Sequence, residues 1–187
     1  MRDRFYSAQI PMEYNQKLRY RHLIRLKDYD YSQAGVYFVT VCTKNRFCLF
    51  GEIDNDKMRL SSYGEIIRLS WFDLPQHYSN VGLDAFVIMP NHIHGIIFLT
   101  DVGAGLKPAP TVPARHCHPL PEIVRGFKTF SSRKINELRN MSGTALWQRN
   151  YYEHVIRRDE SPEKIREYIE TNPLRWALDK ENPVNRR

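Results

Sequence analysis

The stretch LDAFVIMPNHIHGIIFLT, residues 83–100, decides the fold of this chain. Its two halves, 83–89 and 92–100, are rich in β-branched and aromatic residues, and such residues favour strands. The dipeptide Pro90-Asn91 between them is typical of a turn. The stretch therefore predicts two strands joined by a turn, the second of them strongly apolar and buried.

The residues before this pair predict strands and a helix. Residues 36–43 (VYFVTVCT) predict a strand, and residues 47–53 predict a second, shorter one that ends at the turn Asp54-Asn55-Asp56. Ser61 or Ser62 can cap a helix whose apolar residues recur at helical spacing. We expect Pro75 to end this helix.

The residues after the pair predict a helix, a strand and a last helix. Residues 120–140 predict a basic helix, and the weak alternation of residues 146–157 predicts a strand. Ser161 and Pro162 are typical of a helix start, with the serine as cap and the proline at the first position. This helix is expected to end before Pro173, because a proline disfavours helix at the residue before it.

Apart from the short strand 47–53, the order of these elements is strand, helix, strand, strand, helix, strand and an extra helix. It predicts an α+β, ferredoxin-like split βαβ fold, in which one antiparallel sheet carries helices on one face. We expect one domain over residues 35–178, preceded by a basic arm, 1–34, and followed by a short tail, 179–187. Residues 101–119 are rich in Gly and Pro and predict a flexible surface insertion.

The composition favours a nucleic-acid partner and argues against a membrane protein. The 187 residues include 28 Lys and Arg against 21 Asp and Glu, a formal net charge of +7. Such a balance favours a polyanion, because neutralised phosphates release their counterions. No run approaches the ~18 apolar residues of a membrane helix, the N-terminus has no signal-peptide pattern, and the three cysteines form no disulfide framework. We therefore expect a cytoplasmic protein.

The motif His92-Ile93-His94 is the first candidate site. On a strand, residues i and i+2 face the same side, so both imidazoles can converge on one metal ion. Two solvated strand histidines would match the same pattern, and the spacing alone leaves both interpretations open.

The pair Tyr168 and Asn172 is the second candidate site. The two residues are four apart, so on a helix their side chains share one face. A phenol and an amide oxygen can serve as a nucleophile beside a neutral metal ligand. The alternative is a half-buried helix tyrosine and an ordinary helix-end asparagine.

Two further groups of residues are candidates for contacts with nucleic acid. The predicted helix 120–140 carries cations suited to phosphate contacts, although a solvated helix would look similar. The segment 147–154 carries aromatic residues that can stack on bases or pack in a strand, and a histidine that can assist the site or make a structural hydrogen bond. The candidates are Arg125, Lys128, Arg133, Trp147, Gln148, Tyr152 and His154.

The motifs taken together resemble a known family. Met89-Pro90-Asn91-His92-Ile93-His94 resembles the His-hydrophobic-His (HUH) strand of the single-tyrosine transposases of bacterial insertion sequences. Further motifs resemble the REP-associated tyrosine transposase branch and follow in the same order: Gly126-Phe127-Lys128, Trp147-Gln148, Tyr151-Tyr152-Glu153-His154 and Tyr168-Ile169-x-x-Asn172-Pro173.

The resemblance implies a DNA strand-cleaving and strand-transferring enzyme. It implies that residues 35–178 cut and rejoin single-stranded DNA near hairpins through a 5′-phosphotyrosine, with Mg²⁺ or Mn²⁺ as cofactor. Tyr168 matches the nucleophile, His92 and His94 match the metal ligands, and Asn172 stands where insertion-sequence members carry a glutamine ligand. Tyr151 and Tyr152 are rival nucleophiles. The protein is expected to act as a monomer or homodimer, associated with the bacterial nucleoid when bound to DNA.

Other functions remain open at this point. A related HUH nickase, of the replication-initiator or relaxase type, would use the same ligands on another substrate. A non-catalytic ferredoxin-like module would bind nucleic acid without a metal and without a covalent adduct. An inactive transposase descendant is a third alternative, although every expected site residue is present.

Overall fold

A computed structural model describes residues 30–100, 117–157 and 159–185. Most of the predicted arm, residues 1–29, and most of the predicted insertion, residues 101–116, lie outside the described residues. Within the described part of the chain, no helix combines the length and the apolar character that crossing a membrane requires.

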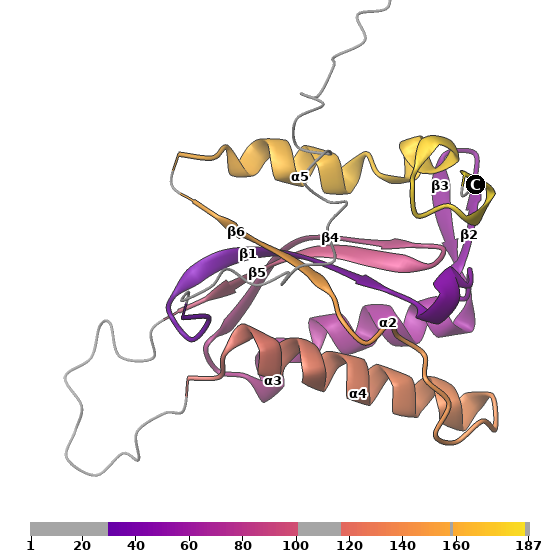
Figure 1. Ribbon diagram of the computed structural model, residues 1–187, viewed down its shortest axis with the longest axis horizontal. Helices are drawn as coiled ribbons and strands as arrows, with labels where there is room; N and C mark the ends of the chain where they lie inside the picture. Colours follow the sequence, from indigo (N-terminus) through magenta and orange to yellow (C-terminus); the bar gives the residue numbers. More distant parts are fainter. Residues whose placement is uncertain (1–29, 101–116, 158, 186–187) are drawn as a thin grey trace, which may run out of the picture.

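A four-stranded antiparallel sheet forms the centre of the protein (Figure 1). Its strands are β1 (Gly35–Cys42), β4 (Val81–Met89), β5 (His92–Leu99) and β6 (Tyr152–Ile156), in the spatial order β4-β5-β1-β6. The pairs β1–β5, β1–β6 and β4–β5 are all antiparallel. The first strand, β1, therefore lies between β5 and β6, as in a ferredoxin-like sheet. The predicted fold class is confirmed.

The helices divide between the two faces of the sheet (Figure 1). The helices α2 (Ser62–Phe72), α3 (Leu74–His77) and α4 (Leu120–Leu138) lie on one side, and α5 (Pro162–Glu170) lies on the other. The 3₁₀ turns η3 (Pro173–Leu178) and η4 (Pro183–Asn185) follow α5. Among the described α-helices, only the predicted extra helix covers this face of the sheet.

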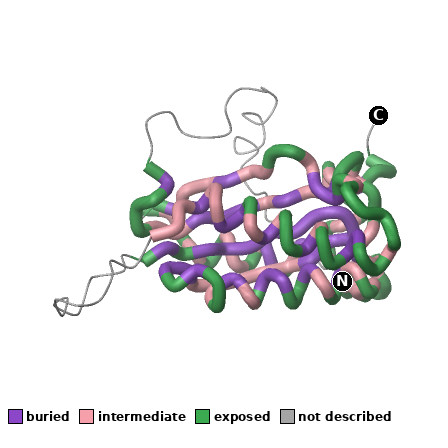
Figure 2. The backbone as a smooth tube through the Cα atoms, turned by 90° about the horizontal axis from the view of Figure 1, so that it is seen from below, coloured by how far each residue is buried: buried purple, intermediate pink, exposed green. Residues whose placement is uncertain are grey.

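Each face of the sheet has its own apolar core, because successive strand side chains point to opposite sides. In β1, Val39 and Val41 pack with the residues of α2 and α4, whereas Phe38 packs with Ile96 of β5 and Ile169 of α5. Figure 2 shows the buried stretches running through the middle of the molecule, with exposed residues around them.

Gly95 lets an indole ring approach the middle of β5. A Cβ atom at this position would lie 2.4 Å from the Trp71 ring, which stacks on Phe86 with ring centroids 4.6 Å apart. Phe127 of α4 packs edge-on against the same indole at 5.6 Å. The glycine that follows the His-hydrophobic-His motif therefore allows α2 to pack closely on the strand that carries both histidines.

A β-hairpin replaces the single short strand predicted at residues 47–53. The strands β2 (Gly51–Asp54) and β3 (Lys57–Leu60) pair with each other, so the prediction is wrong in both extent and number. Asn55 and Asp56 adopt φ values of 48° and 60°. Two successive residues in this left-handed region form the tight turn that joins hairpin strands.

Ser61 caps α2 as predicted, since its side-chain oxygen accepts a hydrogen bond from the backbone N–H of Gly64 at 3.2 Å. Pro75, however, does not end this helix. The helix α2 ends at Phe72, and Pro75 lies in the first turn of α3, where its missing N–H removes no intrahelical hydrogen bond.

The predicted strand 146–157 is shorter, because only β6, residues 152–156, pairs as a strand. Trp147 forms an isolated bridge with Thr43. Ser161 precedes α5 as predicted, but its hydroxyl donates to the Glu163 carboxylate at 2.9 Å, and it caps no N–H of the described helix.

Candidate functional site

The two histidines of β5 lie side by side on one face of the sheet. Their Nε2 atoms are 3.1 Å apart, and their ring centroids are 4.6 Å apart. His92 is 0% exposed and His94 is 4% exposed. The predicted convergence of the two imidazoles is therefore present in the fold, in a buried place and not in solvent.

Asn91 sets the protonation of His92. The Asn91 amide nitrogen donates to the carbonyl oxygens of Arg46, at 3.0 Å, and Glu181, at 2.7 Å, so its Oδ1 atom is left as an acceptor. This oxygen lies 2.8 Å from Nδ1 of His92, which must donate to it. The lone pair of His92 is consequently on Nε2, the atom that faces His94.

His94 has a similar partner on its other nitrogen, because its Nδ1 atom lies 2.7 Å from the hydroxyl of Thr40. Burial, together with the charge of Lys180, lowers the pKa of His94 to about 3. Burial and the neighbouring His94 also hold the pKa of His92 well below its usual value. Both rings are therefore neutral at pH 7, which is the form of imidazole that binds metals.

The donor atoms fit a divalent cation. Adjacent ligands of an octahedral ion with bonds of ~2.1 Å lie about 3 Å apart, close to the 3.1 Å between the two Nε2 atoms. Asn172 is 2% exposed, and its Oδ1 atom has no hydrogen-bond partner among the described residues. The described chain holds no group of three His, Cys, Asp or Glu residues suited to a metal. This buried amide oxygen remains the candidate that the sequence predicts as a third protein ligand.

The helix α5 places Tyr168 against the histidines. Its ring centroid lies 5.4 Å from that of His94 and 6.1 Å from that of Phe38. Asn172 lies just beyond the helix, after Thr171 has left helical geometry with a ψ of 1°, and a side-chain hydrogen bond still joins it to Tyr168. Burial raises the pKa of the Tyr168 phenol, and a side-chain hydrogen bond with Asn172 opposes this rise.

Apolar contacts hold α5 on the sheet. Ile169 is completely buried and packs with Phe38, Ile96 and Ile156, and Ile165 borders the same cluster. The spacing of these isoleucines directs one face of the helix to the sheet, and Tyr168 lies on the edge of that face.

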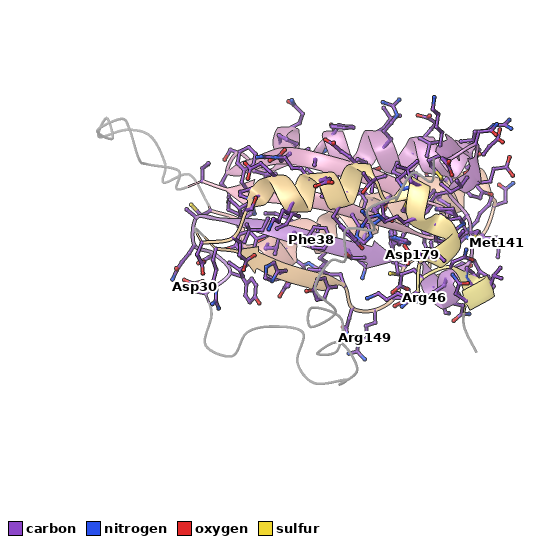
Figure 3. All side chains as sticks on the ribbon, turned by 90° about the horizontal axis from the view of Figure 1, so that it is seen from above. Asp30, Phe38, Arg46, Met141, Arg149 and Asp179 are labelled. Atoms are coloured by element: carbon purple, nitrogen blue, oxygen red, sulfur yellow. The ribbon has the colours of Figure 1, made fainter. Side chains whose placement is uncertain are left out.

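The C-terminal segment covers His92 and was missed by the sequence reasoning. The Trp176 ring lies 6.1 Å from the His92 ring, and Asp179 Oδ2 lies 3.8 Å from His92 Nε2. Burial raises the pKa of Asp179, against the nearby charges of Lys180 and Arg46. Figure 3 shows Asp179 and Arg46 near each other beside the C-terminal turns. Asp179 is one acidic residue in a short polar tail, and no motif in the sequence marks it as part of a site.

Two of the predicted DNA contacts share the face of the sheet that carries the histidines. In the register, Thr40 of β1 lies between His94 of β5 and Tyr152 of β6. His154 lies beside Phe38 in the next row on the same face, and its Nε2 atom is 2.6 Å from the Glu160 carboxylate.

The other predicted DNA contacts lie along α4, on the opposite side of the sheet. Arg125 and Arg133 are exposed, whereas the Lys128 ammonium donates to the carbonyl oxygens of Gln148, at 2.6 Å, and Arg149, at 3.0 Å. Burial lowers the pKa of Lys128. Arg125, Lys128 and Gln148 line a groove of about 830 Å³ between α4 and residues 143–151.

Trp147 and Tyr151 belong to the core under α2 and α4. Trp147 is 6% exposed, packs 5.2 Å from the Phe50 ring, and donates its indole N–H to the Ser131 hydroxyl at 3.0 Å. Tyr151 is partly buried against the same core. The fold therefore brings Tyr168 and Tyr152, but not Tyr151, to the face of the histidines.

Comparisons with known proteins agree with this arrangement. No family model matches the chain. A Haemophilus influenzae protein called "Uncharacterized protein" is 40% identical over 177 residues, which cover 89% of this chain and 96% of that protein. A second H. influenzae protein, called "Putative REP-associated tyrosine transposase", is 26% identical over 148 residues, 78% of this chain and 74% of its own length.

A solved structure shares the fold. It is a REP-associated tyrosine transposase bound to a REP hairpin, and it aligns with 83% of this chain and 76% of its own length. The TM-score is 0.55 and the sequence identity is 18%. The ordered motifs, the 26%-identical relative and the shared fold make the chain similar to the REP-associated tyrosine transposases.

Proposed function

We propose that this protein cuts and rejoins single-stranded DNA beside hairpins through a 5′-phosphotyrosine intermediate. Tyr168 is the nucleophile, and His92, His94 and Asn172 hold Mg²⁺ or Mn²⁺. The observation that carries the proposal is the contact of the Tyr168 ring with His94, 5.4 Å between centroids, beside two imidazole nitrogens 3.1 Å apart.

The donor set is consistent with either cation. Imidazole nitrogen suits Mn²⁺ better than Mg²⁺, whereas an amide oxygen suits both. When bound, the cation would withdraw charge from a non-bridging oxygen of the scissile phosphate. The chain's own part is to keep both imidazoles neutral and oriented, through the hydrogen bonds of His92 with Asn91 and of His94 with Thr40.

The Tyr168 oxygen attacks the phosphorus atom as its proton leaves. A new bond forms between the phenol oxygen and phosphorus, and the bond from phosphorus to the 3′ oxygen breaks. The released strand takes a proton and ends in a 3′-OH, and the other strand stays on Tyr168 through its 5′ phosphate. The covalent bond retains the energy of the phosphodiester, so the reverse reaction can rejoin DNA without ATP.

Asn172 supports ionisation of the nucleophile. Its side-chain hydrogen bond with Tyr168 lowers the phenol's pKa, in opposition to the effect of burial. The amide nitrogen of Asn172 can make this bond while its buried Oδ1 atom remains available to a cation. One side chain thus connects the nucleophile and the metal ligands.

A DNA hairpin is the substrate that the charge and the relatives favour. The structural neighbour is bound to a REP hairpin, and this chain carries a net charge of +7. Tyr152 and His154 lie on the face of the histidines, where they can contact unpaired bases. Because His92 is fully buried beside Trp176 and Asp179, entry of a phosphate requires this C-terminal segment to move.

The test is an incubation with labelled single-stranded hairpins taken from the DNA that flanks the protein's own gene, with and without Mn²⁺. We expect a metal-dependent protein–DNA adduct that survives denaturation, and strand transfer between two hairpin ends. Tyr168→Phe should bind the hairpin and form no adduct. Tyr152→Phe, the matched control on the same face, should bind the hairpin and still form the adduct.

Other outcomes contradict the proposal in distinct ways. Nicking with an adduct but without strand transfer would indicate a nickase. Hairpin binding without any adduct would indicate a non-catalytic module. An adduct that persists in Tyr168→Phe and disappears in Tyr152→Phe would move the nucleophile to Tyr152.

A further inference from the structure

An arginine–carboxylate pair ties the tyrosine-bearing helix to the edge of the sheet. Arg166 of α5 meets Asp84 of β4 with Nε 3.1 and 3.0 Å from the two carboxylate oxygens and a terminal nitrogen 2.7 Å from Oδ2. Such a two-point contact with a planar guanidinium fixes direction as well as distance. Tyr168 follows Arg166 by two residues on the same short helix.

A β-bulge places the carboxylate where the arginine can reach it. In the pairing of β4 with β5, Leu83 lies opposite Ile97 and Phe86 lies opposite Gly95. Between these pairs, two residues of β4, Asp84 and Ala85, face a single residue of β5. A bulge of this kind inserts one extra residue and turns its side chain away from the regular alternation. The backbone N–H of Ala85 donates to Asp84 Oδ1 at 2.8 Å and holds the carboxylate in place.

The contribution of this pair is geometric more than energetic. The Arg166 and Asp84 side chains are 40% and 30% exposed, and ion pairs this accessible contribute little to stability. Ile165 and Ile169 supply the apolar contact of α5, but such contact has no direction and permits the helix to roll or slide. The ion pair opposes both motions at one fixed point.

We propose that Asp84 and Arg166 are positioning residues, which hold α5 in the one orientation that directs Tyr168 at the histidine pair. This inference rests on the proposed function, since it assigns the pair to the strand-cleavage step. Neither residue touches the reacting atoms, and both act through the helix that carries the phenol.

The experiment compares Arg166→Gln, Arg166→Lys and Asp84→Asn with Arg68→Gln. Arg68 of α2 forms a similarly exposed pair with Glu65, at 2.8 Å, on the opposite side of the sheet, and serves as the matched control. The readouts are hairpin affinity and the rate of adduct formation at saturating hairpin with Mn²⁺.

We expect the adduct rate to fall about 10- to 100-fold in each of the first three variants, with hairpin affinity changed less than about twofold. Arg166→Lys should fall with the others, because a lysine keeps the charge but lacks the two-point geometry. The double variant Asp84→Asn/Arg166→Gln should lose no more than either single one, since both changes remove one interaction. Arg68→Gln should match the wild type.

A second readout does not depend on the reaction. In the DNA-free protein, amide hydrogen exchange of residues 165–172 should be faster in Arg166→Gln than in the wild type, while β1 and β5 are unchanged. If the wild type forms no adduct, the proposed function fails, and the exchange alone decides whether the pair fixes the helix. Unchanged exchange and an unchanged rate would overturn the positioning role, and a loss of hairpin affinity parallel to the rate would make Arg166 a DNA contact instead.

Discussion

The buried side chain of Asn91 contributes both to stability and to the orientation of a candidate metal ligand, His92. We predict that Asn91→Ala weakens Mn²⁺ binding through His92. The alanine removes the acceptor 2.8 Å from His92 Nδ1 and so frees the ring to rotate and to change tautomer. Loss of such a partner of a metal-binding histidine costs about 10- to 100-fold in affinity.

The same substitution has a cost in stability that follows from its contacts. Asn91 makes three side-chain hydrogen bonds, to Arg46 O, Glu181 O and His92 Nδ1. At about 1 kcal/mol for each bond, the free energy of unfolding should fall by about 3 kcal/mol. For a chain of this size, that corresponds to a drop in melting temperature of about 6 to 12 °C.

Asn80→Ala is the matched control for this experiment. Asn80 is 1% exposed and, at the far end of β5, bonds through its side chain to both the carbonyl and the N–H of His118. It should lose about 2 kcal/mol of stability and keep the wild-type affinity for Mn²⁺. The measurements are Mn²⁺ titration followed by electron paramagnetic resonance, and thermal unfolding without metal. Wild-type Mn²⁺ affinity in Asn91→Ala, or an equal loss in both variants, would refute the role assigned to Asn91.

Three other predictions concern the strand that carries the histidines. Gly95→Ala should destabilise the protein by about 1 to 3 kcal/mol in thermal unfolding, because its Cβ would lie 2.4 Å from the Trp71 ring; unchanged stability would show that the indole shifts freely. The double variant His92→Ala/His94→Ala should lose Mn²⁺-dependent adduct formation in a gel assay, and unaltered cleavage would discard the metal site. In metal-free protein the unfolded chain takes up a proton on His94 near pH 6.5, while burial lowers the folded pKa to about 3, so stability should fall as the pH drops from 6.5 towards 3. Urea unfolding from pH 7 to 4 should show a shallower decline in His94→Gln, and equal slopes would contradict the buried neutral ring.

Local turn chemistry and packing explain where the sequence predictions departed from the structure. The turn at Asn55 and Asp56 was predicted, but the strand β3 that follows it was not, because Lys57–Leu60 is a strand through its pairing with β2. Pro75 was expected to stop a helix, but proline is equally suited to the first turn of the next one. Trp147 matched a base-stacking residue in type, yet its place in the core follows from neighbours far away in the chain.

The sequence by itself determined which side chains share a face of a strand or helix, because side-chain directions repeat over a few residues in both. Alternation along a strand puts His92 and His94 on one face whatever surrounds them. A helical repeat predicts the same for Tyr168 and Asn172, although α5 ends at Glu170, before Asn172. The order of strands and helices was sufficient to predict the ferredoxin-like sheet, because few arrangements of such an order bury every apolar face.

Only the tertiary structure decided that these two pairs meet. It placed α5 on the face opposite α2 and α4, with Tyr168 beside His94, and it brought Asp179 to His92. It also made a bulge at Asp84 that reaches Arg166. These contacts join segments distant in the chain, and they depend on how side chains fill space between elements, for which a sequence has no repeating signal.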